Sequence, residues 1–317
     1  MPLDLQLTDP SIVVVDRSGE RLPYSRGIMA TSLLATGVST EEAYRLASSI
    51  QAELHRDSGR ELPAEELVEI TEAILRSREG GDAIAERWMA WRTAKRTGRP
   101  LVIALGGAPG VGKSTFATRL AVRLGITRIV TTDAIREVLR TVVPAAVLSE
   151  LHASTFELTD APGRDGFASF DRQCDVVTSA MTSVAQRLAA EHRSMIAEGV
   201  HLVPGALTTA LADHPAAPIV VERLAIAPAG THAANLRQRA TSEPLRGGER
   251  HVGSFDRIRA ISDHLVDTAA ETGTGVVDVG LAGEMTQDIV DEIVARAAAS
   301  PPVAPASGTD PSRPEAA

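Results

Sequence analysis

The sequence contains few cysteine, lysine and aromatic residues. Cys174 is the only cysteine among the 317 residues, so no disulfide can form between them, and we expect its thiol to fill space in an apolar helix. Aromatic residues make up 3% of the sequence, so a core must be built from Ala, Val, Leu and Ile. Only two of the 32 lysine and arginine residues are lysines, Lys95 and Lys113.

Long apolar runs and an excess of positive charge are missing as well. No stretch approaches the roughly 18 consecutive apolar residues of a membrane-spanning helix. The N-terminal MPLDLQLTDP also lacks the basic and then apolar order of a signal peptide. We therefore expect a cytoplasmic protein that does not bind membranes. The formal net charge of −9 disfavours a nucleic acid as a partner.

Three regions separate along the chain. Region 1–97 begins with a short strand, a turn at Ser18-Gly19 and a second extended piece. Helical patterns then follow in 39–55, 64–77 and 81–95, which predicts a small, mostly helical domain. Region 299–317 is rich in Pro, Ala and Ser without any periodicity, which predicts a disordered tail.

Region 98–298 alternates apolar strands with helical patterns. The strands are continuous apolar runs, as is typical of parallel strands that are covered on both faces. The alternation predicts an α/β fold with a doubly wound parallel sheet. The predicted strands are 101–105, 126–130, 194–199, 218–226 and 275–280.

The stretch GGAPGVGKST (106–115) contains the Walker A pattern between a predicted strand and a predicted helix. Its glycines let backbone N–H groups face phosphates, and the N-terminus of the next helix attracts negative charge. The compact ammonium of Lys113 is expected to act catalytically at the β- and γ-phosphates, and the Ser114 hydroxyl to bind Mg²⁺. We therefore predict ATP and Mg²⁺ as cofactors. The predicted cofactor-binding residues are Gly107, Ala108, Pro109, Gly110, Val111, Gly112, Lys113, Ser114 and Thr115.

Asp133 follows the second predicted strand of this region and precedes a helical pattern, which allows two interpretations. As a helix cap, its carboxylate accepts hydrogen bonds from the N–H groups of the first turn. As a catalytic group at the carboxyl end of a strand, it contacts the substrate and accepts the proton of an attacking hydroxyl. Arg136 lies one turn further on, where a guanidinium can hold an anionic substrate. We expect the pair to be functional.

Glu198 and His201 follow at the end of the third predicted strand. An acidic residue in an otherwise apolar strand has few structural explanations, so we predict that Glu198 is catalytic and helps to hold Mg²⁺. His201 lies in a loop that Pro204 and Gly205 stiffen. It is either a structural histidine or a residue that binds the substrate.

Six arginines crowd the region after the fourth predicted strand. Pro244 and Gly247-Gly248 interrupt the helical pattern there, so some of these arginines are expected on a movable loop. Such a loop above a phosphate site excludes water and neutralises the transferred group, whereas the alternative is a solvated helix face. We predict substrate contacts from Arg239, Arg246 and Arg250. The six arginines are Arg237, Arg239, Arg246, Arg250, Arg257 and Arg259.

Four segments together resemble the 2-phosphoglycerate kinase family of P-loop kinases: GGAPGVGKST, TTDAIREVLR, AEGVHLVPG and RGGERHVGSFDRIRAISDHL. Region 11–50 is similar to the ATP-cone-like module that these proteins carry at the N-terminus. The resemblance implies a P-loop kinase that uses ATP to convert 2-phosphoglycerate to 2,3-bisphosphoglycerate. The predicted arginine contacts call for a small anionic acceptor, and the resemblance identifies this acceptor as 2-phosphoglycerate.

Three residues depart from the pattern of the family. Asn235 stands where an arginine is expected, which leaves open a different acceptor or a substituting arginine. Asp16 and Gly27 stand where nucleotide-binding cones have basic residues, so we expect a structural or dimerisation module, with which a homodimer is compatible. Two alternatives to the assignment remain: a P-loop kinase for another acceptor, including an RNA-linked hydroxyl, and a non-catalytic regulator that binds ATP.

Overall fold

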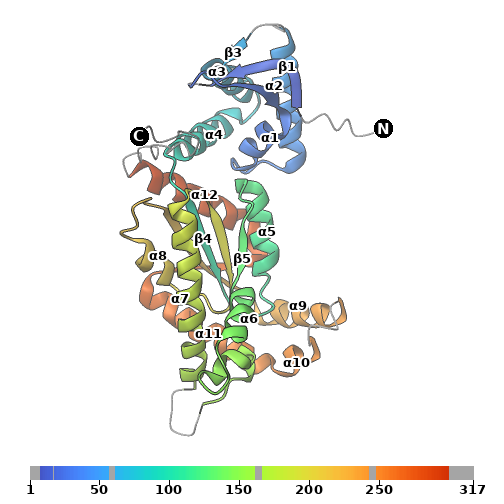
Figure 1. Cartoon of the computed structure of the whole chain (residues 1–317). Helices are drawn as coiled ribbons and strands as arrows, with labels where there is room; N and C mark the ends of the chain where they lie inside the picture. The colour runs from blue at the N-terminus through green and yellow to red at the C-terminus, as the bar shows by residue number, and fades with distance from the viewer. Residues whose placement is uncertain (1–7, 17, 57–60, 161–165, 243–247, 300–317) are drawn as a thin grey trace, which may run out of the picture.

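The computed structural model describes residues 8–16, 18–56, 61–160, 166–242 and 248–299. A small N-terminal module lies at one end of a larger α/β part, and the strands of the larger sheet run away from it (Figure 1). The predicted disordered tail, apart from Ala299, and the predicted lid residue Arg246 lie outside the described residues.

The N-terminal module is mostly helical, as the sequence predicts, with a three-stranded sheet in the order β2-β1-β3. The carboxylate of Asp16 shapes the turn between the first two strands by accepting hydrogen bonds from the N–H groups of Ser18 and Glu20, both at 2.8 Å. The sequence did not predict α1 or β3. The elements are β1 (Thr8–Val15), β2 (Arg21–Ser25), α1 (Arg26–Leu34), α2 (Thr40–Arg56), β3 (Glu61–Pro63), α3 (Ala64–Arg76) and α4 (Gly81–Arg96).

The larger part contains a five-stranded sheet in the order β5-β6-β4-β7-β8, and every neighbouring pair is parallel. All five predicted strands are confirmed, with shifts at their ends. β4 and β6 are buried along their whole length, which explains their continuous apolar sequence. The strands are β4 (Leu101–Gly106), β5 (Ile129–Thr131), β6 (Met195–Gly199), β7 (Ile219–Ile226) and β8 (Gly275–Asp278).

Helices cover both faces of this sheet, because alternate residues of each strand point to opposite sides. Leu101, Ile103 and Leu105 pack against α5 (Lys113–Leu124) and α12 (Ala282–Ala298). Val102 and Ala104 pack on the other face against α7 (Ala168–Ala190) and α8 (Ala206–Leu211). The remaining elements include α6 (Thr132–Val142), α9 (Ala229–Ser242), α10 (Gly248–Gly253), α11 (Phe255–Thr272) and the 3₁₀ turns Ser149–His152, Thr155–Glu157 and Val279–Leu281.

Helix α4 belongs to both parts of the molecule. Trp88 is buried in the core of the N-terminal module, whereas Trp91, three residues later, is buried in the core around α5 and α12. Arg123 near the end of α5 completes the contact, because its guanidinium donates to the carbonyls of Leu34 at 2.6 Å and Val38 at 3.0 Å. The N-terminal module therefore packs directly on the helix that begins at the Walker A lysine.

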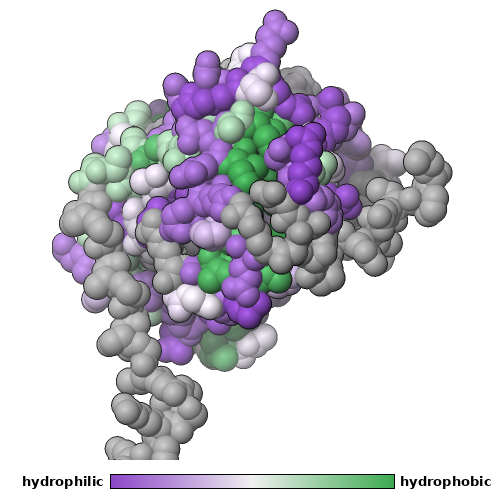
Figure 2. Space-filling view, turned by 90° about the horizontal axis from the view of Figure 1, so that it is seen from above, coloured by the Kyte–Doolittle hydropathy of each residue, from purple (hydrophilic) through white to green (hydrophobic). Residues whose placement is uncertain are grey.

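The surface seen from above is largely hydrophilic, with hydrophobic residues showing only in small groups between charged and polar ones (Figure 2). No helix within the described residues is both long enough and apolar enough to cross a membrane.

Candidate active site at the carboxyl ends of the strands

The Walker A loop connects β4 to α5 and depends on its glycines. Gly107, Gly110 and Gly112 have φ angles of 141°, 85° and 102°, a region that residues with a side chain rarely adopt. A Cβ atom at Gly110 would lie 2.4 Å from a methyl group of Leu236, and one at Gly107 would lie 2.5 Å from a backbone oxygen. The helix begins at Lys113, so its first N–H groups face the loop. The predicted cofactor-binding segment 107–115 thus has the backbone shape of a phosphate cradle.

Glu198 lies directly beside this loop. Its strand position is paired with Leu105 of β4 and with Thr131 of β5, at the carboxyl ends of all three strands. The Ser114 hydroxyl donates to one carboxylate oxygen of Glu198 at 3.0 Å. The other oxygen, Oε2, is buried and has no hydrogen-bond partner. Because a buried carboxylate oxygen without a partner is costly, this atom marks a place for a ligand.

The donor set of Ser114 and Glu198 suits Mg²⁺. This ion keeps several waters and is usually held by one or two carboxylates together with substrate phosphates. Within the described residues no group of three or more His, Cys, Asp and Glu side chains could enclose a metal by itself. A hydroxyl and one carboxylate beside a phosphate cradle match the binding mode of Mg²⁺ better than that of a structural metal.

Lys113 is partly buried among charged groups of both signs. Its ammonium donates to the Ala108 carbonyl at 3.4 Å. Burial is the main cause that lowers the pKa of Lys113, while Glu198 and Asp133 act to raise this pKa and Arg239 adds to the lowering. Three charged residues from three segments are therefore close enough to act electrostatically on one ammonium group.

Asp133 is not the cap of α6. The cap is Thr131, whose side chain accepts a hydrogen bond from the N–H of Ala134 at 3.1 Å. The structure thus removes the interpretation of Asp133 as a cap and leaves its carboxylate, with 77% of the side chain exposed, in the first turn of the helix. This carboxylate is available to a substrate at the same end of the sheet as the Walker A loop.

Arg136 has a structural task that the sequence did not reveal. Its guanidinium donates to the carbonyls of Leu151 at 3.0 Å and Ala153 at 3.2 Å, and it pairs with Glu137 at 3.2 Å. Arg136 therefore fixes the 3₁₀ turn Ser149–His152 against α6. Its predicted contact with a substrate stays a prediction.

His201 is placed differently from the substrate-binding residue that the sequence suggested. The side chain has 0% exposure. Its ring nitrogens lie 2.9 Å from the Thr132 hydroxyl and 3.2 Å from the amide oxygen of Gln173. Because protein groups enclose the ring and occupy both nitrogens, His201 takes the structural alternative and does not face a substrate. Neither Thr132 nor Gln173 was identified from the sequence.

The predicted lid arginines have different surroundings. Arg239 on α9 acts on the pKa of Lys113, which places it near the Walker A loop. Arg250 on α10 forms an ion pair with Glu157 in the turn Thr155–Glu157. Two further arginines bind backbone carbonyls: Arg257 donates to Gly166 at 2.7 Å and Arg259 to Ala227 at 3.1 Å. Arg239 is thus the predicted substrate arginine that the structure brings nearest to the ammonium of Lys113.

The first turns of α9 rest on the Walker A loop, a contact that the sequence did not predict. His232 lies with Nε2 2.7 Å from the Pro109 carbonyl, and Asn235 donates to the Gly110 carbonyl at 3.1 Å. Asn235, which stands where the resemblance to the family implies an arginine, therefore holds the phosphate cradle. Arg239 follows it one helical turn later, on the same side of α9.

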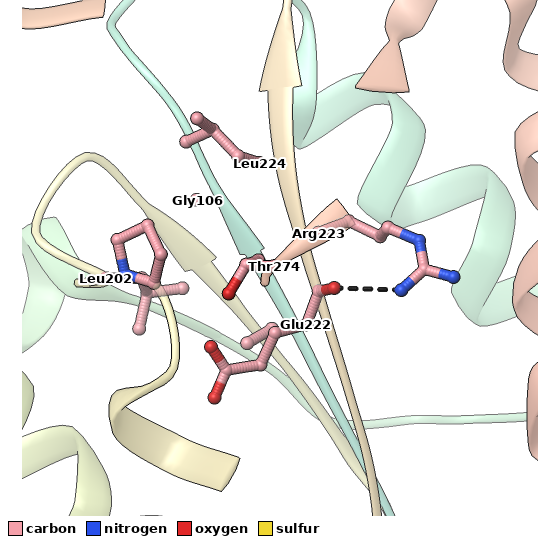
Figure 3. A pocket seen from close by; sticks show the side chains of 8 residues that line it. Gly106, Leu202, Glu222, Arg223, Leu224 and Thr274 are labelled. Carbon is pink, nitrogen blue, oxygen red and sulfur yellow. Dashed lines mark hydrogen bonds between the residues drawn. The ribbon is translucent and has the colours of Figure 1, made fainter. Parts of the chain in front are cut away.

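A second carboxylate in the sheet, Glu222, is structural. It accepts hydrogen bonds from the N–H groups of Gly205 and Thr208, both at 2.6 Å, and so caps the start of α8. Figure 3 shows it beside Gly106, Leu202 and Thr274 around a small cavity. The cavity volume is about 10 Å³, the lower limit for one water molecule, so no acceptor fits there.

Comparison with known proteins agrees with this geometry. The ATP cone domain family matches residues 12–97. A 2-phosphoglycerate kinase from Pyrococcus furiosus is 34% identical over 273 residues, which covers 84% of this chain and 88% of that protein. One from Methanopyrus kandleri is 34% identical over 86% of this chain and 83% of its own length. One from Methanocaldococcus jannaschii is 34% identical over 87% and 88%. With the phosphate cradle, the carboxylate beside it and this similarity along most of its length, the chain belongs to the 2-phosphoglycerate kinase family.

Proposed function

We propose that this protein transfers the γ-phosphoryl group of ATP to the free hydroxyl of 2-phosphoglycerate, which gives ADP and 2,3-bisphosphoglycerate. Membership of the family supports the acceptor. The observation that carries the chemistry is the convergence of Lys113, Ser114, Glu198 and Asp133 at the carboxyl ends of β4, β5 and β6. Such a site holds a nucleoside triphosphate and offers a carboxylate to a second substrate.

The nucleotide site follows from the Walker A loop. Backbone N–H groups of 107–115 hold the phosphates, and the ammonium of Lys113 stabilises the negative charge of the γ-phosphoryl group as it is transferred. Ser114 and the unpartnered Oε2 of Glu198 would hold Mg²⁺. When bound, the ion neutralises charge on the β- and γ-phosphates.

The acceptor side follows from Asp133. The acceptor hydroxyl oxygen forms a bond to the γ-phosphorus, the bond from that phosphorus to the bridging oxygen of ADP breaks, and the hydroxyl proton passes to the Asp133 carboxylate. The first turn of α6 presents this carboxylate to solvent, so an acceptor can approach it.

Arginines supply the recognition of the acceptor's phosphate and carboxylate. Planar guanidinium groups bind these anions through two parallel hydrogen bonds. Arg239 lies on α9, one turn after Asn235, which holds the Walker A loop, and it is close enough to Lys113 to act on its pKa. Arg250 joins it if the acceptor phosphate replaces Glu157 as the partner of its guanidinium. Arg246 and Arg136 remain further candidates.

An acceptor panel tests the proposal. The purified protein is incubated with ATP, Mg²⁺ and 2-phosphoglycerate, 3-phosphoglycerate, unphosphorylated glycerate or a nucleoside, and formation of ADP and of the phosphorylated product is followed. We expect 2-phosphoglycerate to give the highest kcat/KM and glycerate to be poor, because it leaves the arginines without a phosphate partner. The product should be 2,3-bisphosphoglycerate.

The two lysines provide a matched pair of variants for this assay. Lys113→Ala should lower kcat by about 10²-fold or more, because the lost ammonium acts mainly on the transition state. Lys95→Gln should stay near wild type, since Lys95 lies against the Trp91 ring, 5.8 Å from its centroid. Preference for glycerate or a nucleoside would refute the acceptor, and absence of turnover with every acceptor would support the non-catalytic alternative.

A further inference from the structure

Three fully buried polar side chains connect the start of α6 to α7 and to the loop after β6. Thr132, Gln173 and His201 each have 0% exposure. His201 lies between the other two, with Nδ1 2.9 Å from the Thr132 hydroxyl and Nε2 3.2 Å from the Gln173 amide oxygen. Buried polar groups that are fully hydrogen-bonded fix one arrangement of the segments that carry them.

The amide of Gln173 determines which ring nitrogen carries the proton. Its nitrogen donates to the carbonyls of Glu150 at 2.5 Å and Ala153 at 3.1 Å, so its oxygen must face His201. This oxygen can only accept a hydrogen bond, and Nε2 of His201 is therefore protonated. Nδ1 of the neutral ring then has a lone pair that accepts from the Thr132 hydroxyl. Each hydrogen bond in the series from Thr132 through His201 to Gln173 therefore has a defined donor and acceptor.

Thr132 has little freedom apart from this bond. A Cβ atom on Gly199 would lie 1.8 Å from the Thr132 hydroxyl, so the side chain packs directly on the backbone at the end of β6. Glu198, the neighbour of Gly199, carries the proposed Mg²⁺ site. Asp133, the neighbour of Thr132, carries the proposed proton acceptor. One buried contact thus sets the distance between the two halves of the active site.

We propose that His201 is a positioning residue, which, through the Thr132 hydroxyl, holds the first turn of α6 and hence the carboxylate of Asp133 against the end of β6. This inference rests on the proposed function, in which Asp133 accepts the proton. His201 does not touch the substrate. Its effect on the reaction comes from the place it gives to the neighbouring carboxylate, where a displacement of about 1 Å can cost 10²-fold in rate.

On its Nε2 side, the His201 ring connects through Gln173 to the turn Ser149–His152. Gln173 and Arg136 both donate to the Ala153 carbonyl, and they also hold the carbonyls of Glu150 and Leu151 respectively. The turn Ser149–His152 is therefore fixed by α7 and α6 at once. Burial lowers the pKa of His201 to about 4, so the ring is neutral near pH 7 and keeps the lone pair that Thr132 needs. The charged groups that act on the ring are Asp133, Arg136 and Lys113.

Two amide variants separate the two sides of the ring. In His201→Asn the amide occupies roughly the place of Nδ1 and can still accept from Thr132, whereas in His201→Gln it extends to the place of Nε2 and reaches only Gln173. We expect His201→Gln to lower kcat by about 10- to 100-fold with an unchanged KM for ATP, and His201→Asn to lose clearly less. Thr132→Val replaces the hydroxyl with a methyl group of similar size, which cannot donate to Nδ1, and should match His201→Gln.

The matched control is Thr71→Val in the N-terminal module, where an equally buried threonine bonds only to a carbonyl of its own helix. It should lower stability without changing kcat. Equal losses of kcat in His201→Asn and His201→Gln, or a kcat near wild type in Thr132→Val, would overturn the positioning role. A ¹⁵N NMR spectrum that shows the proton of His201 on Nδ1 would overturn it as well.

Failure of the proposed function gives a different result. Wild-type protein would then fail to phosphorylate 2-phosphoglycerate, and the same comparison of variants would be made with the acceptor that the panel identifies. The ¹⁵N spectrum needs no turnover at all. It therefore tests the hydrogen-bond directions even if the acceptor assignment is wrong.

Discussion

Asp133 shows how a structure can remove one of two interpretations that a sequence leaves open. An aspartate before a helix usually caps it, and the sequence alone could not exclude that role. The structure gives the cap to Thr131, which leaves the exposed Asp133 carboxylate without that structural task. Glu198 shows the converse: its acidic side chain in a buried strand already indicated a ligand site in the sequence.

Asp133→Asn should therefore separate activity from stability. We expect kcat to fall by about 10²-fold or more through loss of the general base, while the free energy of unfolding falls by only about 0.3–1 kcal/mol through the lost charge at a helix N-terminus. Asp256→Asn is the matched control, because Asp256 also lies in the first turn of a helix, α11. A kcat for Asp133→Asn within a few-fold of wild type would remove Asp133 from the mechanism.

His201 should make stability depend on pH. Burial lowers its folded-state pKa to about 4, below the ordinary value of 6.5. Between these two pH values the unfolded chain binds a proton that the folded chain does not, so the free energy of unfolding falls as the pH is lowered from 6.5 to 4. The full effect is about 3 kcal/mol.

Urea unfolding at pH 7, 6 and 5 measures this dependence. The difference in unfolding free energy between wild type and His201→Asn should shrink as the pH is lowered, because only the wild type carries the buried imidazole. A difference that stays constant over this range would show that the ring is not held neutral by the fold.

The strands show how much of the elements a sequence determines. Continuous apolar runs located all five strands of the larger sheet, but the second was predicted at 126–130 and lies at Ile129–Thr131. Gly125 ends α5 with a φ of 65°, and the N–H of Ile126 donates back to the Ala121 carbonyl at 2.9 Å. Ile126 is thus the apolar residue that closes a helix end, and its character was mistaken for the start of a strand.

Contacts between distant elements were beyond the sequence. His201 meets partners 69 and 28 residues away, at Thr132 and Gln173, and nothing in the local pattern of either segment indicates the pairing. The seating of α9 on the Walker A loop belongs to the same class, because His232 and Asn235 meet carbonyls more than a hundred residues earlier. Periodicity predicts elements, whereas such buried polar pairings depend on how the elements are assembled.

Through Asn235, helix α9 should affect the KM for ATP more than the KM for the acceptor. Asn235→Ala removes the hydrogen bond to the Gly110 carbonyl, and the loss of about 1 kcal/mol should raise KM for ATP by about 5-fold. KM for 2-phosphoglycerate should change little. Thr241→Val on the same helix, whose hydroxyl bonds only to the Arg237 carbonyl within α9, should leave both values near wild type. If the acceptor KM rises instead, Asn235 contacts the acceptor and not only the loop.

At the scale of the whole molecule, the N-terminal module packs against the kinase part. Helix α4 contributes Trp88 to one core and Trp91 to the other, and Arg123 binds two carbonyls of the module from the end of α5. Arg99, in the connection between α4 and β4, donates to the Ala217 carbonyl at 2.5 Å and so fixes this connection against the kinase part. This packing suits a module that supports the fold of α5.

The last prediction concerns nucleotide binding by that module. The ATP cone domain family matches residues 12–97. The resemblance to nucleotide-binding cones implies a basic residue at position 16, where this chain has Asp16. Its carboxylate accepts hydrogen bonds from the N–H groups of Ser18 and Glu20 and from the Ser18 hydroxyl at 2.6 Å, so it shapes the turn and places negative charge there. A carboxylate at this place repels a polyphosphate, and the structural role of Asp16 keeps it in position.

Equilibrium titration with ATP and Mg²⁺ should therefore find one nucleotide per chain. That site should be the Walker A loop, because Lys113→Ala should weaken it strongly while Asp16→Asn leaves it unchanged. Asp16→Asn is the matched control, since an asparagine oxygen can still accept the N–H groups of the turn while the charge is removed. Two sites per chain, of which one survives in Lys113→Ala, would show that the N-terminal module binds nucleotide in spite of Asp16, and its contact with α5 would then connect the two sites.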